Sequence, residues 1–141
     1  MALRAAKSDP AGVRTRLRTA GLRSTRQRVA LASLLFQDRQ RHVTAESLHA
    51  EAIVAGISVS LATVYNTLNQ FVMAGMLRQV AADAERSYFD TNAAAHQHFY
   101  IEEDRTLIDI PDEMIEMASV PKPPEGTCID RIDVVIRIKR T

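Results

Sequence analysis

Two histidines separated by one residue, His96 and His98, are the side chains of this chain that could most directly bind a metal ion. Side chains two positions apart along a β-strand point to the same side, so both imidazoles could converge on one ion. Two histidines alone hold a metal weakly, and histidines on the surface of a hinge would need no metal. The pattern therefore predicts a candidate metal site that requires further ligands.

A second candidate is a helix expected over residues 60–74, whose exposed face is hydrogen-bonding rather than charged. Ser60 is suited to cap its first turn, and Gly75 to end it in a left-handed turn. Amides and hydroxyls can pair with base edges and phosphates in the DNA major groove, while an ordinary amphipathic helix is the alternative. The expected buried stripe is Leu61, Val64, Leu68, Phe71 and Val72, and the expected exposed residues are Thr63, Tyr65, Asn66, Thr67, Asn69 and Gln70.

Three helices are predicted before this one. The first begins near Asp9-Pro10 and runs toward Gly21. The second is capped by Ser24 or Thr25, and the third runs from Thr44 to Gly56. The apolar face of the second helix is expected to contain Val29, Leu31, Ala32, Leu34, Leu35 and Phe36. Arginines that could face a polyanion lie on the first helix and at the start of the second: Arg14, Arg16, Arg18, Arg23, Arg26 and Arg28.

Strand-like runs follow the polar helix, at residues 77–81 and 86–91, and predict a hairpin. Helices followed by a hairpin indicate a winged helix-turn-helix, in which the polar helix is the recognition helix and the hairpin is the wing. Beyond a hinge at residues 92–95, we expect strands at 98–104 and 106–110, a helix over 111–119 and a strand over 129–140. Ile132, Val134, Ile136 and Ile138 would lie on one face of that last strand.

The predicted fold class is α+β, with a disordered basic tail at 1–8, a DNA-binding domain at 9–91 and a small α/β domain at 96–141. A β-α-β unit of this size has little core and an exposed sheet edge. Dimerisation would cover both, so the second domain is expected to form a homodimer.

Charge is distributed unevenly, although the net charge is only +1. Residues 1–80 hold eleven basic and four acidic side chains, whereas residues 81–126 hold three basic and eleven acidic ones. This asymmetry favours a first module that faces a polyanion, with a solvated surface and a basic tail as the alternative. No run is long enough for a membrane span, and the single cysteine, Cys128, excludes internal disulfides and a structural zinc site built from four cysteines. A cytoplasmic setting fits these features.

The sequence from Arg41 to Val80, with SYFDT and AAHQHFY after it, resembles the ferric uptake regulator family over residues 12–140. The LATVYNTLNQF run, the His-x-His pair and the lack of CxxC motifs are most similar to the iron response regulator branch, which reports haem status. Membership would imply a dimeric, metal-responsive transcription factor, usually a repressor.

The resemblance implies a ligand set for the metal. His42 at the start of the third helix, Asp90 at the end of the wing and Asp109 on the next strand match positions that complete an inter-domain site with His96 and His98. Such a set suits Zn²⁺, Fe²⁺ or Mn²⁺. For haem, His96 or His98 would be the first ligand and His42 the next. His49 is the remaining candidate, although it is expected to be an exposed helix residue.

Departures from the family pattern remove other sites. Where the family's structural zinc site has its first CxxC pair, this chain has Ile101 and Asp104. At a further site in the dimerisation domain it has Ala95, Gln97, Glu116 and Ile132, so that site is also expected to be lost. Asn66 stands where the family commonly has arginine. Cys128 precedes isoleucine, so it forms no Cys-Pro haem motif.

The sequence thus predicts a homodimer that binds an operator in double-stranded DNA. Arg14, Arg16, Arg23, Arg26 and Arg28 would bind phosphates, Tyr65 would contact the backbone or a thymine methyl, and Thr63, Asn66 and Asn69 would read bases. A metallohydrolase would need a general base that the sequence does not supply. A haem- or metal-binding module without DNA binding is the other alternative.

Overall fold

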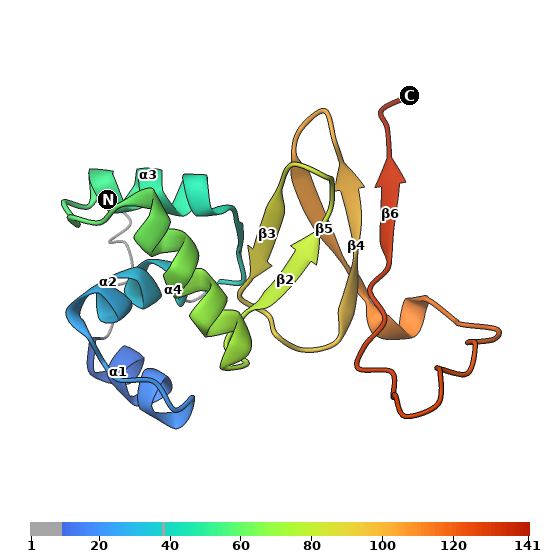
Figure 1. Ribbon diagram of the computed structural model, residues 1–141. Helices are drawn as coiled ribbons and strands as arrows, with labels where there is room; N and C mark the ends of the chain where they lie inside the picture. Colours follow the sequence, from blue (N-terminus) through green and yellow to red (C-terminus); the bar gives the residue numbers. More distant parts are fainter. Residues whose placement is uncertain (1–9, 38) are drawn as a thin grey trace. The chain divides into compact units, whose positions relative to one another are not determined.

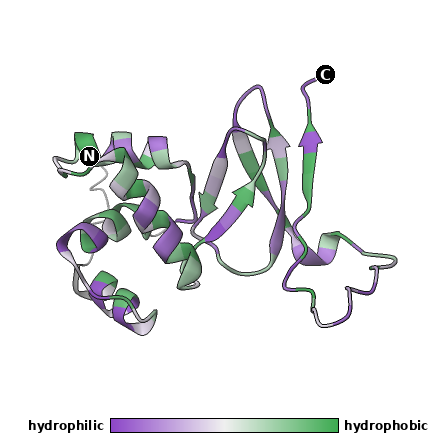
Figure 2. Cartoon of the chain, in the orientation of Figure 1, coloured by the Kyte–Doolittle hydropathy of each residue, from purple (hydrophilic) through white to green (hydrophobic). Residues whose placement is uncertain are grey.

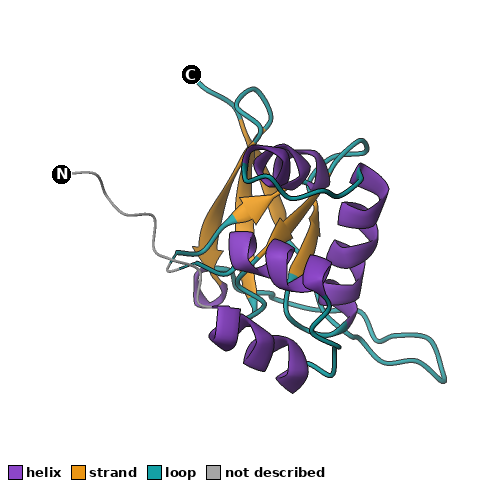
Figure 3. Cartoon of the chain, turned by 90° about the vertical axis from the view of Figure 1, so that its left-hand side faces the viewer, coloured by secondary structure: helices purple, strands orange, loops and turns teal. Residues whose placement is uncertain are grey.

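The computed structural model describes residues 10–37 and 39–141 (Figure 1). The chain divides into two compact units, of which the first ends at Ala93 and the second begins at Ala94. The tail expected at 1–8 and the helix-initiating Asp9 lie outside the described residues. The α+β fold class is confirmed. Every α-helix of the described residues lies in the first unit, and none is long and apolar enough to cross a membrane. Figure 3 distinguishes the helices from the strands by colour.

Four helices build the first unit: α1 (Pro10–Thr19), α2 (Arg26–Leu35), α3 (Ala45–Val54) and α4 (Leu61–Met73). Hydrophobic and hydrophilic residues alternate in bands along them (Figure 2). Each helix contributes fully buried residues to one core, which is how short helices gain stability that they lack alone. These core residues include Leu17, Leu31, Leu35, Leu48, Val64, Leu68 and Phe71.

Side-chain caps set where three of the helices begin. Thr25, Thr44 and Ser60 each accept a hydrogen bond from the backbone N–H three residues later. Thr44 forms a reciprocal capping box, because the Thr44 backbone N–H also donates to the Ser47 hydroxyl at 3.0 Å. Gly75 has a φ of 78° just after α4, the left-handed conformation expected at a helix end.

The burial of residues on α4, the candidate recognition helix, differs from the prediction at two positions. Leu61 is 36% exposed because it is the first helical residue, and Thr67 is 5% exposed because it shares a face with Val64 and Phe71. Tyr65, Asn66, Asn69 and Gln70 are exposed, as expected. The hydrogen-bonding face is therefore real, but narrower than predicted.

A three-stranded antiparallel sheet completes the first unit, in the order β1-β3-β2. Strands β2 (Arg78–Ala81) and β3 (Ser87–Asp90) form the predicted hairpin. The third strand, β1 (His42–Val43), was not predicted; it pairs His42 with Asp90 and Val43 with Phe89. His42 thus lies in a strand, two residues before the Thr44 cap, and not at the start of a helix.

The second unit is a mixed sheet in the order β5-β4-β6. Strand β4 (His96–Ile101) pairs antiparallel with β5 (Thr106–Pro111) and parallel with β6 (Val135–Ile138). Strand β6 is shorter than predicted, and its Ile136 and Ile138 are each 38% exposed. One edge of β6 and one of β5 have no neighbouring strand among residues 94–141.

The helix expected over residues 111–119 is wrong. Residues Asp112–Met114 form a single 3₁₀ turn, and residues 115–134 contain no helix or strand. Met114 is 72% exposed and Met117 47%, so a helix here would have had no packed apolar face to stabilise it. The unit is therefore a β-sheet domain and not the β-α-β arrangement predicted.

Replacing Thr44 by alanine should lower the free energy of unfolding by about 1 kcal/mol, because it leaves the Ser47 backbone N–H without its acceptor. Chemical denaturation measures this. Thr44→Ser keeps the hydroxyl and serves as the control, with a change of a few tenths of a kcal/mol. Equal stability of the alanine and serine variants would show that the cap contributes nothing.

Candidate metal centre and nucleic-acid interface

In the second unit, His96, His98 and Asp109 form a compact cluster. Strand alternation puts both histidines on one face of β4, and the register places Asp109 directly opposite His98. The Nε2 atoms of His96 and His98 lie 3.3 and 3.4 Å from the same carboxylate oxygen, Asp109 Oδ1. The ring centroids are 4.5 Å apart. Three potential ligand atoms thus lie within 4.8 Å of one another, which makes the cluster a candidate metal site.

Backbone contacts orient the first of these histidines. The His96 Nδ1 lies 2.7 Å from the Ala94 carbonyl oxygen, so Nδ1 carries the proton and donates it. In that tautomer the metal-binding lone pair is on Nε2, the atom that faces Asp109. Both histidines are buried, whereas the Asp109 side chain is one-third exposed.

In the first unit, the end of the sheet holds a second pair of candidate ligands. His42 Nε2 lies 3.0 Å from Asp90 Oδ2, and the other Asp90 oxygen accepts the Asn92 backbone N–H at 2.9 Å. Asp90 has no exposed surface, and a buried carboxylate requires partners of this kind. His42 and Asp90 lie opposite each other because they are paired residues in the antiparallel ladder of β1 and β3.

Gln97, which separates the two histidines, faces the other side of β4. Its side-chain N–H donates to Asp112 Oδ1 at 3.0 Å, and its Oε1 accepts the Val134 N–H at 2.6 Å. The amide therefore joins β4 to the 3₁₀ turn and to the segment before β6. Ala95 and Ile132, two other positions of the further site that was expected to be lost, have aliphatic side chains.

His49 was expected to be an exposed helix residue, and this was wrong. It is partly buried on α3, and its Nε2 lies 3.0 Å from the Val59 carbonyl oxygen. This contact ties α3 to the loop before α4.

Tyr65 on α4 has a fixed orientation. Its hydroxyl donates to Glu46 Oε1 on α3 at 2.7 Å. This hydrogen bond holds the pKa of the Glu46 carboxyl below its usual range and raises the pKa of Tyr65 above its own. Sequence reasoning missed Glu46, since the two residues lie on different helices.

The other candidate DNA-contact residues differ in their exposure and in the contacts that they already make within the protein. Arg14, Arg23 and Arg26 are exposed, as are Asn66 and Asn69. Arg16 places its guanidinium 4.2 Å from the centre of the Phe36 ring. The Thr63 hydroxyl accepts a hydrogen bond from Ser60 at 2.9 Å and belongs to the cap of α4.

Arg28 joins α2 to α4. Its Nε and one terminal nitrogen donate to Gln70 Oε1 at 3.2 and 3.1 Å, and the other terminal nitrogen donates to the Arg23 carbonyl at 3.1 Å. Side-chain hydrogen bonds of this arginine therefore join α4 to α2. Gln70, which sequence reasoning treated only as an exposed residue of α4, is its partner.

The amino-acid sequence of this chain is similar to those of known proteins of one family. Residues 19–129 match the ferric uptake regulator family. The ferric uptake regulation protein of Pseudomonas aeruginosa is 35% identical over 101 residues, which cover 71% of this chain and 75% of that protein. That of Shigella flexneri is 35% identical over 103 residues, covering 72% and 70%.

Solved structures agree with this match. The ferric uptake regulator of Pseudomonas aeruginosa with manganese superimposes with a TM-score of 0.68 at 27% identity, over 91% of this chain and 97% of that one. The regulator of Vibrio cholerae gives 0.71 at 25% identity, over 90% and 98%.

Replacing Glu46 by alanine should lower the pKa of Tyr65 toward that of a free tyrosine, because the hydroxyl loses the carboxylate that accepts its proton. Titration of the ring-carbon NMR signals of Tyr65 measures the change. Glu113→Ala, an exposed glutamate of the second unit, is the control and should leave Tyr65 unaffected. An unchanged Tyr65 pKa without Glu46 would contradict the contact.

Proposed function

The chain belongs to the ferric uptake regulator family of metal-responsive transcriptional regulators, and we propose that it is a homodimeric repressor that acts on operator DNA in the cytoplasm. Its signal would be a divalent metal bound by His42, Asp90, His96, His98 and Asp109. Members of this family are transcription regulators and not enzymes, which removes the metallohydrolase alternative.

The distances from both histidines to Asp109 carry the metal proposal. Ligands about 2.0–2.1 Å from a four- or five-coordinate ion lie about 3.0–3.6 Å from one another. The two Nε2···Oδ1 separations, 3.3 and 3.4 Å, fall in that range and exceed the usual length of a charge-assisted hydrogen bond. These two separations support the proposal that the three side chains bind one ion.

Three residues hold an ion less firmly than four or five, so we propose that His42 and Asp90 complete the set. Asp90 and His96 are separated by residues 91–95, which span at most about 20 Å when fully extended. An ion that takes ligands from both ends of this short linker would restrict the angles available between the two units. A ligand that favours one arrangement shifts the population toward it.

Nitrogen and oxygen ligands of this kind suit Zn²⁺, Fe²⁺ and Mn²⁺. Five ligands exceed a tetrahedral shell, which favours an ion that accepts five or six. The Pseudomonas aeruginosa relative was solved with manganese, and we propose that the same class of ion binds here.

Haem is the second candidate signal, and we retain it because the LATVYNTLNQF run and the His-x-His pair are most similar to the iron response regulator branch. His96 or His98 would be its ligand, with His42 next. Histidine ligation would shift and sharpen the Soret absorption band of haem, whereas Zn²⁺ and Mn²⁺ have no such band, so titration with each separates the two.

For DNA binding, we propose that α4 enters the major groove, with Tyr65, Asn66 and Asn69 nearest the bases and the Thr63 cap behind them. Arg14, Arg16, Arg23 and Arg26 would bind phosphates, and Arg28 would use the donor capacity that Gln70 leaves. Two copies related by a two-fold axis would read half-sites about one helical turn apart. The exposed β6 edge of the second unit is the surface proposed to bring the two copies together.

Replacing His96 and His98 together by alanine should abolish the change in operator affinity on adding Mn²⁺, because the ion loses two of its proposed ligands. Fluorescence anisotropy with and without EDTA measures the response. Far-UV circular dichroism should remain that of the folded protein.

His49→Gln is the matched control, since glutamine can still donate to the Val59 carbonyl and the residue lies outside the proposed ligand set. It should respond to Mn²⁺ as the wild-type protein does. If the double variant kept a full metal response, the proposed site would be incorrect.

Arg14→Ala should reduce the magnitude of the slope of log affinity against log salt concentration by about one unit. Each phosphate contact releases about one counterion when the protein binds, and this variant makes one contact fewer. Affinity should fall similarly for operator and random duplexes. Lys122→Ala, which removes an exposed basic side chain from the loop after β5, should leave the slope unchanged. Equal slopes for wild type and Arg14→Ala would remove Arg14 from the DNA interface.

A further inference from the structure

We propose that Arg41 is a positioning residue that couples the metal ligand His42 to the helices that hold the recognition helix; this inference rests on the proposed function. Arg41 immediately precedes His42 in the chain. Sequence reasoning assigned it no role, and its contacts are with residues far from it in sequence.

The backbone of Arg41 extends the ladder that carries His42 and Asp90. Its N–H donates to Thr91 Oγ1 at 2.8 Å, and its carbonyl accepts the Thr91 N–H at 3.0 Å. The pairs Arg41–Thr91 and His42–Asp90 are therefore adjacent rungs. A displacement of the His42 main chain by an ion would act on Arg41, its neighbour in the same ladder.

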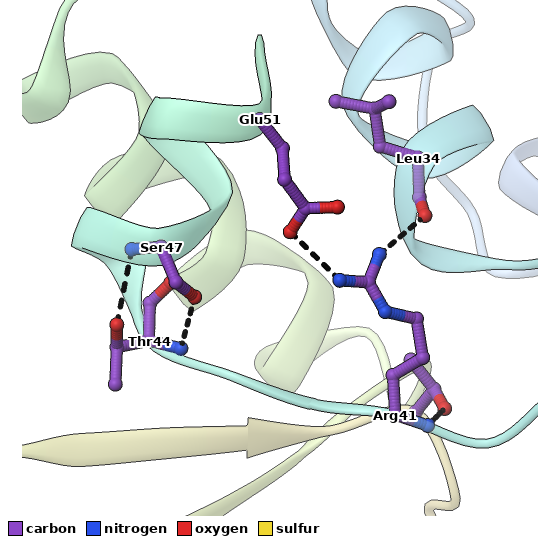
Figure 4. Close-up of polar contacts among 6 residues, drawn as sticks. Leu34, Arg41, Thr44, Ser47 and Glu51 are labelled. Atoms are coloured by element: carbon purple, nitrogen blue, oxygen red, sulfur yellow. Dashed lines mark hydrogen bonds and ion pairs between the residues drawn. The ribbon is translucent and has the colours of Figure 1, made fainter. Parts of the chain in front are cut away.

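The side chain of Arg41 reaches two helices at once (Figure 4). One terminal nitrogen donates to the Leu34 carbonyl in the last turn of α2 at 2.8 Å, and the other donates to Glu51 Oε2 near the end of α3 at 2.7 Å. The Leu34 carbonyl belongs to the last turn of α2, where carbonyls have no intrahelical partner. The Arg41 side chain is only 14% exposed and that of Glu51 is 38% exposed, so the arginine end of this ion pair is less screened than in a surface ion pair.

Helix α3 packs against α4, and α2 is joined to α4 through Arg28 and Gln70. Arg41 is thus bonded to both helices that position α4, through a rigid planar group whose donors are fixed relative to one another. Arg41 is also the residue directly before His42, which is a proposed metal ligand. Metal occupancy would reach the DNA-binding face through these bonds, and not only through the angle between the units.

The test compares operator affinity with Mn²⁺ and with EDTA for the full chain, using a duplex that the wild-type protein selects from a random library under either condition. Arg41→Met keeps the apolar stem and removes the donors. We expect wild type to respond by about 5- to 150-fold. In Arg41→Met the response should shrink by about 3- to 30-fold.

Two readouts separate coupling from folding. Calorimetric affinity for Mn²⁺ and operator affinity in EDTA should both stay within about threefold of wild type in Arg41→Met. Arg41→Lys, which can donate to Leu34 or Glu51 but lacks the planar fork for both, should give an intermediate response. Arg39→Met removes an exposed arginine two residues away and should respond as wild type does.

A full metal response in Arg41→Met would overturn the inference, as would parallel loss of Mn²⁺ affinity or of metal-free operator binding. If Arg41→Met does not fold, Glu51→Met provides the test, since it removes the oxygen that accepts the Arg41 hydrogen bond; an undiminished response there would also overturn the inference. A wild-type protein that does not respond to Mn²⁺ or haem would contradict the proposed function itself. The two failures are therefore distinguishable.

Discussion

The buried carboxylate of Asp90 is the constraint on which the rest of the arrangement depends. A carboxylate with no exposed surface is stable only if its oxygens are paired, and here His42 and the Asn92 N–H lie at the two oxygens. Meeting that requirement brings the segment before α3 onto the end of the hairpin and creates β1. The same contact holds the imidazole of His42 next to the carboxylate of Asp90, and Asp90 directly precedes the linker of residues 91–95.

The two ends of that linker differ in how they are held. On one side, Arg41 and Thr91 fix the ladder that carries His42 and Asp90 to the helical core. On the other, the Ala94 carbonyl and the strand register orient His96 toward Asp109. An ion that joins the two would bring together elements that are each rigid alone.

Local features of the sequence predicted local structure well. The caps at Thr25, Thr44 and Ser60 act over three residues, and the His-x-His alternation is a property of one strand, so both could be read directly. Pairings between distant segments could not. Strand β1 exists only because β3 is present, and the Tyr65–Glu46 and Arg28–Gln70 contacts join different helices. The helix predicted over residues 111–119 failed for the opposite reason, because favourable local spacing found no packing partner.

An anomalous-scattering map of crystals grown with Mn²⁺ would locate the ion and its ligands. We predict one ion per chain, about 2.0–2.3 Å from nitrogen of His42, His96 and His98 and from oxygen of Asp90 and Asp109. An ion held elsewhere in the chain, or bound only by His96, His98 and Asp109 with His42 and Asp90 still paired to each other, would contradict it.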